Sequence, residues 1–199
     1  MTMHEVKEER RSIASRLRKV LAPIDHRAHE AKQFKMVLSE VELSGHGLSF
    51  AGQQSWTIGN RGFAGPEIER ARELGHLNVW RRFANKTAKT SMWIQLGEFS
   101  SALDATNFAP QLFESILQRP GDATELIEVT EKVQVTGLSS TLVGDERTPY
   151  HDGYRRTRVI VGTIDRWIVS SGFSSTGEVW SWNDIEAIVA DQVKKITVK

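Results

Sequence analysis

The chain of 199 residues contains no cysteine. This absence excludes disulfide frameworks, cysteine-ligated zinc, iron–sulfur clusters and thiol nucleophiles. It does not identify a compartment, because both cytosolic and exported proteins can lack cysteine. Metal sites that use only histidine and carboxylate ligands remain compatible with the composition.

The sequence also lacks long hydrophobic runs. The opening stretch MTMHEVKEERRSIASRLRKVLAP is dense in charge, whereas a signal peptide needs an apolar region of roughly 7 to 15 residues. No later run approaches the ~20 apolar residues of a transmembrane helix, and residues 159–164 form one of the longest. We therefore expect a cytoplasmic protein without a membrane span.

The sequence also lacks a large excess of either charge. The 26 lysines and arginines stand against 25 aspartates and glutamates, which leaves a net charge of +1. Residues 1–36 hold nine cations and five acids, so the other 163 residues hold 17 cations and 20 acids and carry −3. This distribution predicts a basic arm on a mildly acidic body. With 39% hydrophobic residues, the body can bury a core.

Helical periodicity begins in the basic arm. Residues 5–21 predict a helix that ends at Pro23, and residues 25–35 continue it. We therefore divide the chain into a basic helical arm over residues 1–35 and a domain over residues 36–199.

Two further helices are expected in the middle of the chain. The first covers residues 66–74, since Pro66 suits an initial helical turn. The second covers residues 109–118, with Thr106 or Asn107 as its N-cap.

The closing segment predicts the clearest helix. Ser181 followed by Asp184 resembles a capping box. The apolar residues behind it recur at helical spacing and form one stripe: Ile185, Ile188, Val189, Val193 and Ile196. We expect this stripe to pack against a sheet.

Alternating and β-branched segments predict the strands of that sheet. They cover residues 36–50, as a strand or an irregular hairpin, and residues 77–85, 91–99, 125–136, 154–163 and 166–173. Residues 144–153 look turn-rich. The element order predicts an α+β fold in which helices pack on a mostly antiparallel sheet.

Three sequence runs carry a resemblance to a known family. They are VQVTGLSSTLV, the paired strands RRTRVIVGTIDRWIVSSG and the closing helix SWNDIEAIVADQVKKI. With the element order from residue 36 onward, they resemble the PsbP-like fold, whose relatives include actinobacterial LpqN-type lipoproteins and bacterial secretion-effector chaperones. The resemblance implies a PsbP-like sandwich and a non-catalytic binding or adaptor role. A START-like helix-grip fold is the competing architecture, and the helix expected over residues 109–118 argues against it.

Tryptophan is abundant for this length, with six residues. Because tryptophan is enriched in recognition surfaces, we select Trp56, Trp80 and Trp182 as candidates for a ligand or partner surface. Trp93 and Trp167 lie in apolar strands and are expected in the core.

Basic residues near aromatic residues form a second candidate surface. Strand alternation places Arg156 and Arg158 on one side of a predicted strand, where they could contact a partner or phosphates. Salt-bridged or solvated arginines are the alternative interpretation.

Neither catalytic residues nor a cofactor can be assigned. No serine lies in a G-x-S-x-G motif. Asp25, His26, His29 and Glu30 form the tightest group of metal-capable side chains, but their spacing matches no zinc motif, so we assign no metal site.

The sequence thus favours a binding or adaptor protein that recognises a protein partner. A small-molecule-binding domain or enzyme with a pocket between the sheet and the terminal helix is the alternative, and nucleic-acid binding comes third.

Overall fold

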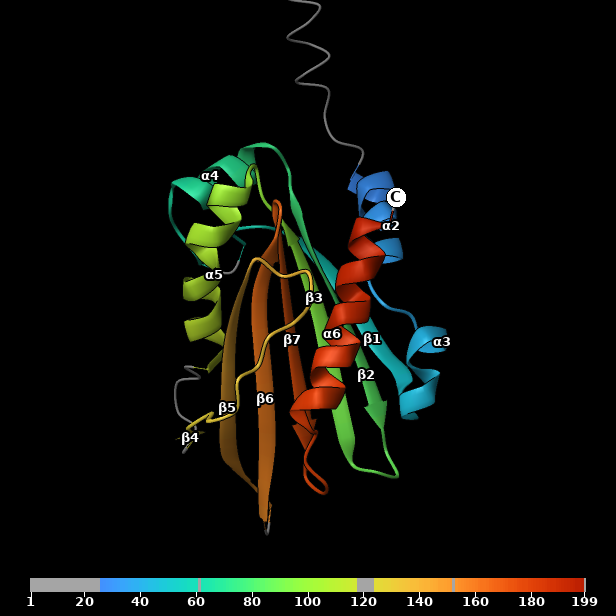
Figure 1. Ribbon diagram of the computed structural model, residues 1–199. Helices are drawn as coiled ribbons and strands as arrows, with labels where there is room; N and C mark the ends of the chain where they lie inside the picture. The colour runs from blue at the N-terminus through green and yellow to red at the C-terminus, as the bar shows by residue number, and fades with distance from the viewer. Residues whose placement is uncertain (1–25, 61, 118–123, 152, 199) are drawn as a thin grey trace, which may run out of the picture.

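The computed structural model describes residues 26–60, 62–117, 124–151 and 153–198. It shows an α+β fold with one antiparallel sheet of seven strands, in the order β1-β2-β3-β7-β6-β5-β4 (Figure 1). The strands are β1 (Ser49–Thr57), β2 (Leu77–Asn85), β3 (Thr90–Glu98), β4 (Glu125–Ile127), β5 (Ser140–Tyr150), β6 (Gly153–Ile164) and β7 (Trp167–Ser175). The helices are α2 (His26–Met36), α3 (Glu40–Leu43), the 3-10 helix η1 (Ser44–His46), α4 (Pro66–Glu73), α5 (Ala102–Leu117) and α6 (Trp182–Thr197). The predicted fold class is confirmed, whereas the helix predicted over residues 5–21 lies outside the described residues.

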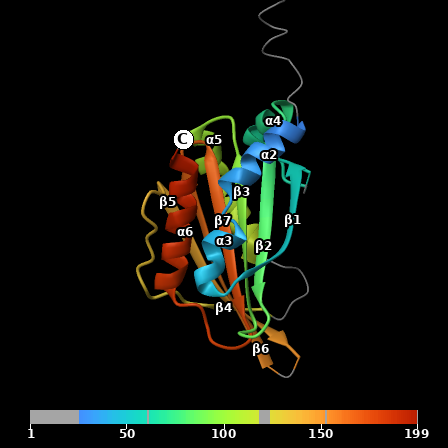
Figure 2. The ribbon, with the colours of Figure 1, turned by 90° about the vertical axis from the view of Figure 1, so that its right-hand side faces the viewer.

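Helix α6 packs along one face of the sheet (Figures 1 and 2). The Ser181 hydroxyl accepts a hydrogen bond from the Asp184 backbone N–H at 3.1 Å and caps the first turn. All five residues of the predicted stripe are buried, in a core shared with α2, α3 and the strands. The prediction that this stripe packs on the sheet is confirmed.

The opposite face of the sheet has its own core. There α4 and α5 cover part of the sheet and contribute Ile68 and Phe108, which pack in one cluster with Val159 and Ile168. The sheet therefore lies between α2, α3 and α6 on one face and α4 and α5 on the other. Among the described residues, no helix has the length and apolar character needed to cross a membrane.

The prediction of a strand or irregular hairpin over residues 36–50 is wrong for most of this segment. The chain instead leaves α2, forms α3 and η1, and enters β1 at Ser49. The cause is distant in sequence: the Gln192 side chain on α6 accepts from the Leu38 N–H at 2.9 Å and donates to the Met36 carbonyl at 2.6 Å. Phe34, which we placed in the arm, lies in the α6-side core.

Helix α5 begins earlier than predicted. It starts at Ala102, where the Ser101 hydroxyl accepts from the Asp104 N–H at 3.1 Å, so neither Thr106 nor Asn107 is the N-cap. Pro110 lies inside this helix at an exposed position.

The two strand predictions before β6 also need correction. Over residues 125–136 only β4 pairs, although Val135 still reaches the α6-side core. Residues 144–150 of the segment that we predicted to be turn-rich are instead part of β5, and the turn itself is found at His151. Gly144 in this strand lies against α5, because a Cβ there would come within 2.8 Å of Leu117.

Candidate functional site

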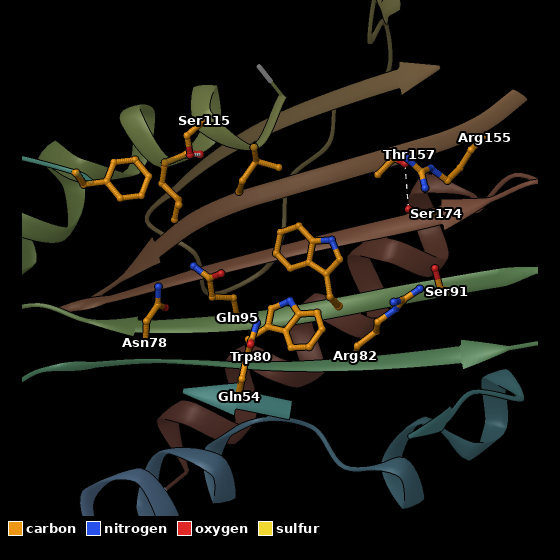
Figure 3. A pocket seen from close by; sticks show the side chains of 14 residues that line it. Gln54, Asn78, Trp80, Arg82, Ser91, Gln95, Ser115, Arg155, Thr157 and Ser174 are labelled. Carbon is orange, nitrogen blue, oxygen red and sulfur yellow. Dashed lines mark hydrogen bonds between the residues drawn. The ribbon is translucent and has the colours of Figure 1, made fainter. Parts of the chain in front are cut away.

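A groove of about 620 Å³ lies on the α5 side of the sheet. Its floor comes from β1, β2, β3, β6 and β7, and α5 forms one wall (Figure 3). The lining residues are Gln54, Phe63, Asn78, Trp80, Arg82, Ser91, Trp93, Gln95, Leu112, Ser115, Ile116, Arg155, Thr157 and Ser174. We call this site the sheet groove.

Two tryptophans give the floor its aromatic surface. Trp80 on β2 pairs with Gln95, and Trp93 on β3 pairs with Arg82, so both indoles point to the same side of the sheet. Trp93 lies directly against the backbone of Gly172, where a Cβ would come within 2.4 Å of its indole nitrogen. Both indoles are partly exposed and can contact a ligand.

Amide side chains line one end of the sheet groove. With its amide oriented to satisfy its hydrogen bonds, Asn78 accepts from Trp56 Nε1 at 3.2 Å and from Gln95 Nε2 at 3.0 Å. It donates to the Leu96 carbonyl at 2.9 Å in the same orientation. These contacts fix the orientation of side chains that a ligand would meet.

The other end of the sheet groove is cationic. Arg82 and Arg155 line it and also line an adjoining hollow of about 680 Å³, to which Lys86 and Lys89 contribute. None of the described residues lining the groove or the hollow is an aspartate or glutamate. The Arg155 guanidinium lies 5.7 Å from the Tyr150 ring, while its buried Nε makes no hydrogen bond within the described structure. This end is therefore suited to an anionic group.

An ion pair joins the two helices beside the sheet groove. Arg70 on α4 binds both carboxylate oxygens of Asp104 on α5, with Nε 3.2 Å from Oδ2. This hydrogen-bonded guanidinium lowers the pKa of Asp104, and the carboxylate raises the pKa of Arg70.

The lowered pKa of Asp104 predicts a pH-dependent contribution to stability. Because the carboxyl is more acidic when folded, its stabilisation is present above the usual aspartate pKa of about 3.9 and is lost as the pH falls through the lower folded-state pKa. Asp104→Asn should lower Tm by a few degrees at pH 7, and this difference should narrow at acid pH. Thermal unfolding between pH 7 and pH 2 measures the Tm difference and its change with pH. The control is Asp191→Asn, at an exposed site. If the difference in Tm between Asp104→Asn and the unaltered chain stays constant with pH, the ion pair does not stabilise the fold as predicted.

The predicted tryptophans have three different environments. Trp80 lines the sheet groove, and Trp56 lines a small adjoining cavity of about 20 Å³. Trp182, which we selected as a candidate surface residue, is only 6% exposed and packs in the α6-side core. Trp93, which we expected in the core, lines the groove instead.

Arg156 and Arg158 lie together, as strand alternation predicts, but both bind Asp145 on β5. Arg156 donates to the two carboxylate oxygens at 2.8 and 2.6 Å, and Arg158 Nε donates at 3.0 Å. This hydrogen-bonded carboxylate raises the pKa of Arg156. Arg158 also lies over the Trp182 ring at 4.6 Å. Both guanidinium groups are thus engaged in salt bridges within the protein, which agrees with the alternative interpretation.

The sheet groove is not the pocket that we expected between the sheet and the terminal helix. The face of the sheet beneath α6 is filled by core residues. A hollow of about 400 Å³ touches α6, but it is lined by α6 together with α3 and the residues flanking α3.

Arg82 and Arg155 were also missed as site residues, although both lie in the basic and aromatic runs of the sequence.

Comparison with known proteins identifies the fold but no family. No family model and no curated protein matches the chain. The extracellular domain of PknH from Mycobacterium tuberculosis is similar in structure, with a TM-score of 0.50 and 11% identity over 80% of this chain and 93% of that domain. An uncharacterised protein from Mycobacterium smegmatis gives a TM-score of 0.42 and 10% identity over 81% of this chain and 95% of its own. The first likeness supports the α+β fold, and the PsbP-like assignment stays a prediction.

Proposed function

We propose that this protein is a non-catalytic binding protein that recognises an acidic segment of a protein partner in the sheet groove. One observation carries the proposal: a floor with two tryptophans continues into a cationic end, and no carboxylate is found among the lining residues that the structure describes. Aromatic rings supply large contact area, and arginines pair with carboxylates. An extended segment with an aromatic or aliphatic side chain next to acidic residues fits both ends.

The shape of the site favours a chain segment over a compact ligand. The sheet groove and the adjoining hollow share Arg82, Ser91, Arg155 and Ser174, so a bound chain could pass from one to the other. A small amphipathic carboxylate is the second candidate, because the volume of the groove lies within the roughly 300 to 1,000 Å³ of small-molecule pockets.

The side chains of the sheet groove support binding without catalysis. Serine and threonine hydroxyls are present, but none of the described lining residues is a histidine or carboxylate that could act as their general base. The cytoplasmic location expected from the sequence remains part of this proposal.

Selection from a random peptide library tests the proposal directly. The full chain, immobilised, should enrich peptides that combine glutamate or aspartate with an aromatic or aliphatic residue. Arg82→Ala combined with Arg155→Ala should reduce binding of the selected peptides at least tenfold and should weaken its dependence on salt. The matched control is Lys194→Ala on α6, which removes an exposed cation from outside the groove.

Three outcomes contradict the proposal. They are enrichment of basic peptides, no enrichment at all, and equal losses in the arginine variant and the Lys194→Ala control. Tight, salt-dependent binding of a single-stranded oligonucleotide, in place of the acidic peptides, would instead favour the nucleic-acid alternative.

A further inference from the structure

A second cluster of functional side chains lies outside the sheet groove. His29 comes from α2, His76 precedes β2, and Glu98 ends β3. Their ligand atoms, one from each residue, all lie within 4.8 Å of one another. Glu98 Oε2 is 3.0 Å from His29 Nε2 and 3.7 Å from His76 Nδ1.

Burial distinguishes this cluster from scattered surface histidines. His76 is 8% exposed and Glu98 is 3% exposed. Within the described structure, His76 Nδ1 is buried and makes no hydrogen bond, although it points at Glu98. The buried Oε1 of the neighbouring Gln33 is also without a hydrogen bond there. Buried polar atoms normally have a partner, so these two atoms indicate a missing interaction.

Surrounding groups hold the carboxylate in one orientation. Arg166 in the turn between β6 and β7 binds Glu98 Oε1 at 2.6 Å. Gln33 donates to Oε2 at 2.9 Å. The oxygen that faces the two histidines is thereby fixed, as outer hydrogen bonds fix the carboxylate ligands of metal sites.

We propose that His29, His76 and Glu98 bind one Zn²⁺ ion, with water completing the coordination. Two imidazoles and one carboxylate are a ligand set that zinc accepts, and three protein ligands leave a fourth position open. Tetrahedral bonds of about 2.0 to 2.2 Å place ligand atoms about 3.3 to 3.6 Å apart. The distances from Glu98 Oε2 to the two histidine nitrogens, 3.0 and 3.7 Å, bracket these values, and all three ligand atoms lie within 4.8 Å of one another. The ion would tie α2 to the sheet.

A purely structural ion-pair network is the rival explanation. In that account His29 and Arg166 hold Glu98 through direct polar contacts, and zinc has no specific site. The two explanations differ in whether the folded chain binds zinc at these three residues.

Zinc titration of the full chain separates them. The protein, first treated with a chelator, should bind one Zn²⁺ per chain in calorimetry, with micromolar or tighter affinity. Bound Co²⁺ should show the intense visible absorption of a low-symmetry, four-coordinate site. His76→Ala should weaken zinc binding by more than roughly 100-fold, because second-shell changes alone can cost 10- to 100-fold. His46→Ala is the control, since His46 is exposed on η1.

A second variant covers the possibility that His76→Ala does not fold. His29 is 20% exposed in its side chain, so His29→Gln should keep the fold in circular dichroism and should still lose most of the zinc affinity. The proposed site is overturned if neither the unaltered chain nor its folded variants bind zinc. An equal affinity for zinc in His29→Gln, His46→Ala and the unaltered chain also overturns it.

Discussion

Asp145→Ala is expected to destabilise the folded chain by about 3 to 5 kcal/mol. Asp145 has a side chain that is 2% exposed and binds both Arg156 and Arg158. Removing the carboxylate leaves the nearly buried Arg158 guanidinium without its counterion next to Trp182 at the start of α6. Chemical denaturation with urea measures the free energy of unfolding, and the loss should appear as a lower midpoint.

An exposed ion pair provides the matched control for this effect. Asp191 pairs with Lys194 on the surface of α6, so Asp191→Ala should change the free energy of unfolding by no more than about 0.5 kcal/mol. If Asp145→Ala also lowers the free energy of unfolding by less than about 1 kcal/mol, the network of Asp145, Arg156 and Arg158 does not stabilise the fold as we argue.

Trp80→Ala should weaken binding of a selected acidic peptide by roughly 2 kcal/mol or more, about 30-fold in Kd. Trp80 is a partly exposed indole on the floor of the sheet groove, and central tryptophans are typical binding hot spots. Fluorescence anisotropy with a labelled peptide measures the change in Kd.

Substitution of a tryptophan outside the sheet groove controls for a general loss of stability. Trp180→Phe alters an indole that packs edge-on against Phe173 on the α6 side of the sheet. It should leave the peptide Kd within about twofold, because it removes no contact with the groove. If Trp80→Ala and Trp180→Phe changed the peptide Kd equally, the assignment of Trp80 to the binding surface would be contradicted.

Much of the fold is local enough to be predicted from the sequence. The alternation in β2 and the stripe of α6 each produce a single buried face, so periodicity locates them. The segment between α2 and β1 could not be predicted in this way. Its backbone is satisfied by Gln192, whose amide lies more than 150 residues away in sequence.

The candidate site was only partly predictable, for a related reason. Trp80 was selected because tryptophan favours recognition surfaces, and the structure places it in the sheet groove. Trp93 was assigned to the core because it lies in an apolar strand. Alternation tells which residues share a face, but it does not tell how much of that face a helix such as α5 covers.

Likewise, alternation correctly paired Arg156 with Arg158, but their partner Asp145 is in β5, which we had taken in part for a turn. The cluster of His29, His76 and Glu98 combines residues from three distant segments. Of the four metal-capable residues that we grouped by sequence, only His29 belongs to it.

The indole N–H signals of the six tryptophans provide the most direct test of the sheet groove. In a ¹H–¹⁵N spectrum assigned by single Trp→Phe variants, a selected acidic peptide is titrated into the labelled chain. Our account predicts that the signals of Trp80 and Trp93 shift with a common Kd, while that of the buried Trp182 stays in place. Shifts at Trp180 and Trp182 without shifts at Trp80 and Trp93 would place the binding surface on the α6 side and contradict it.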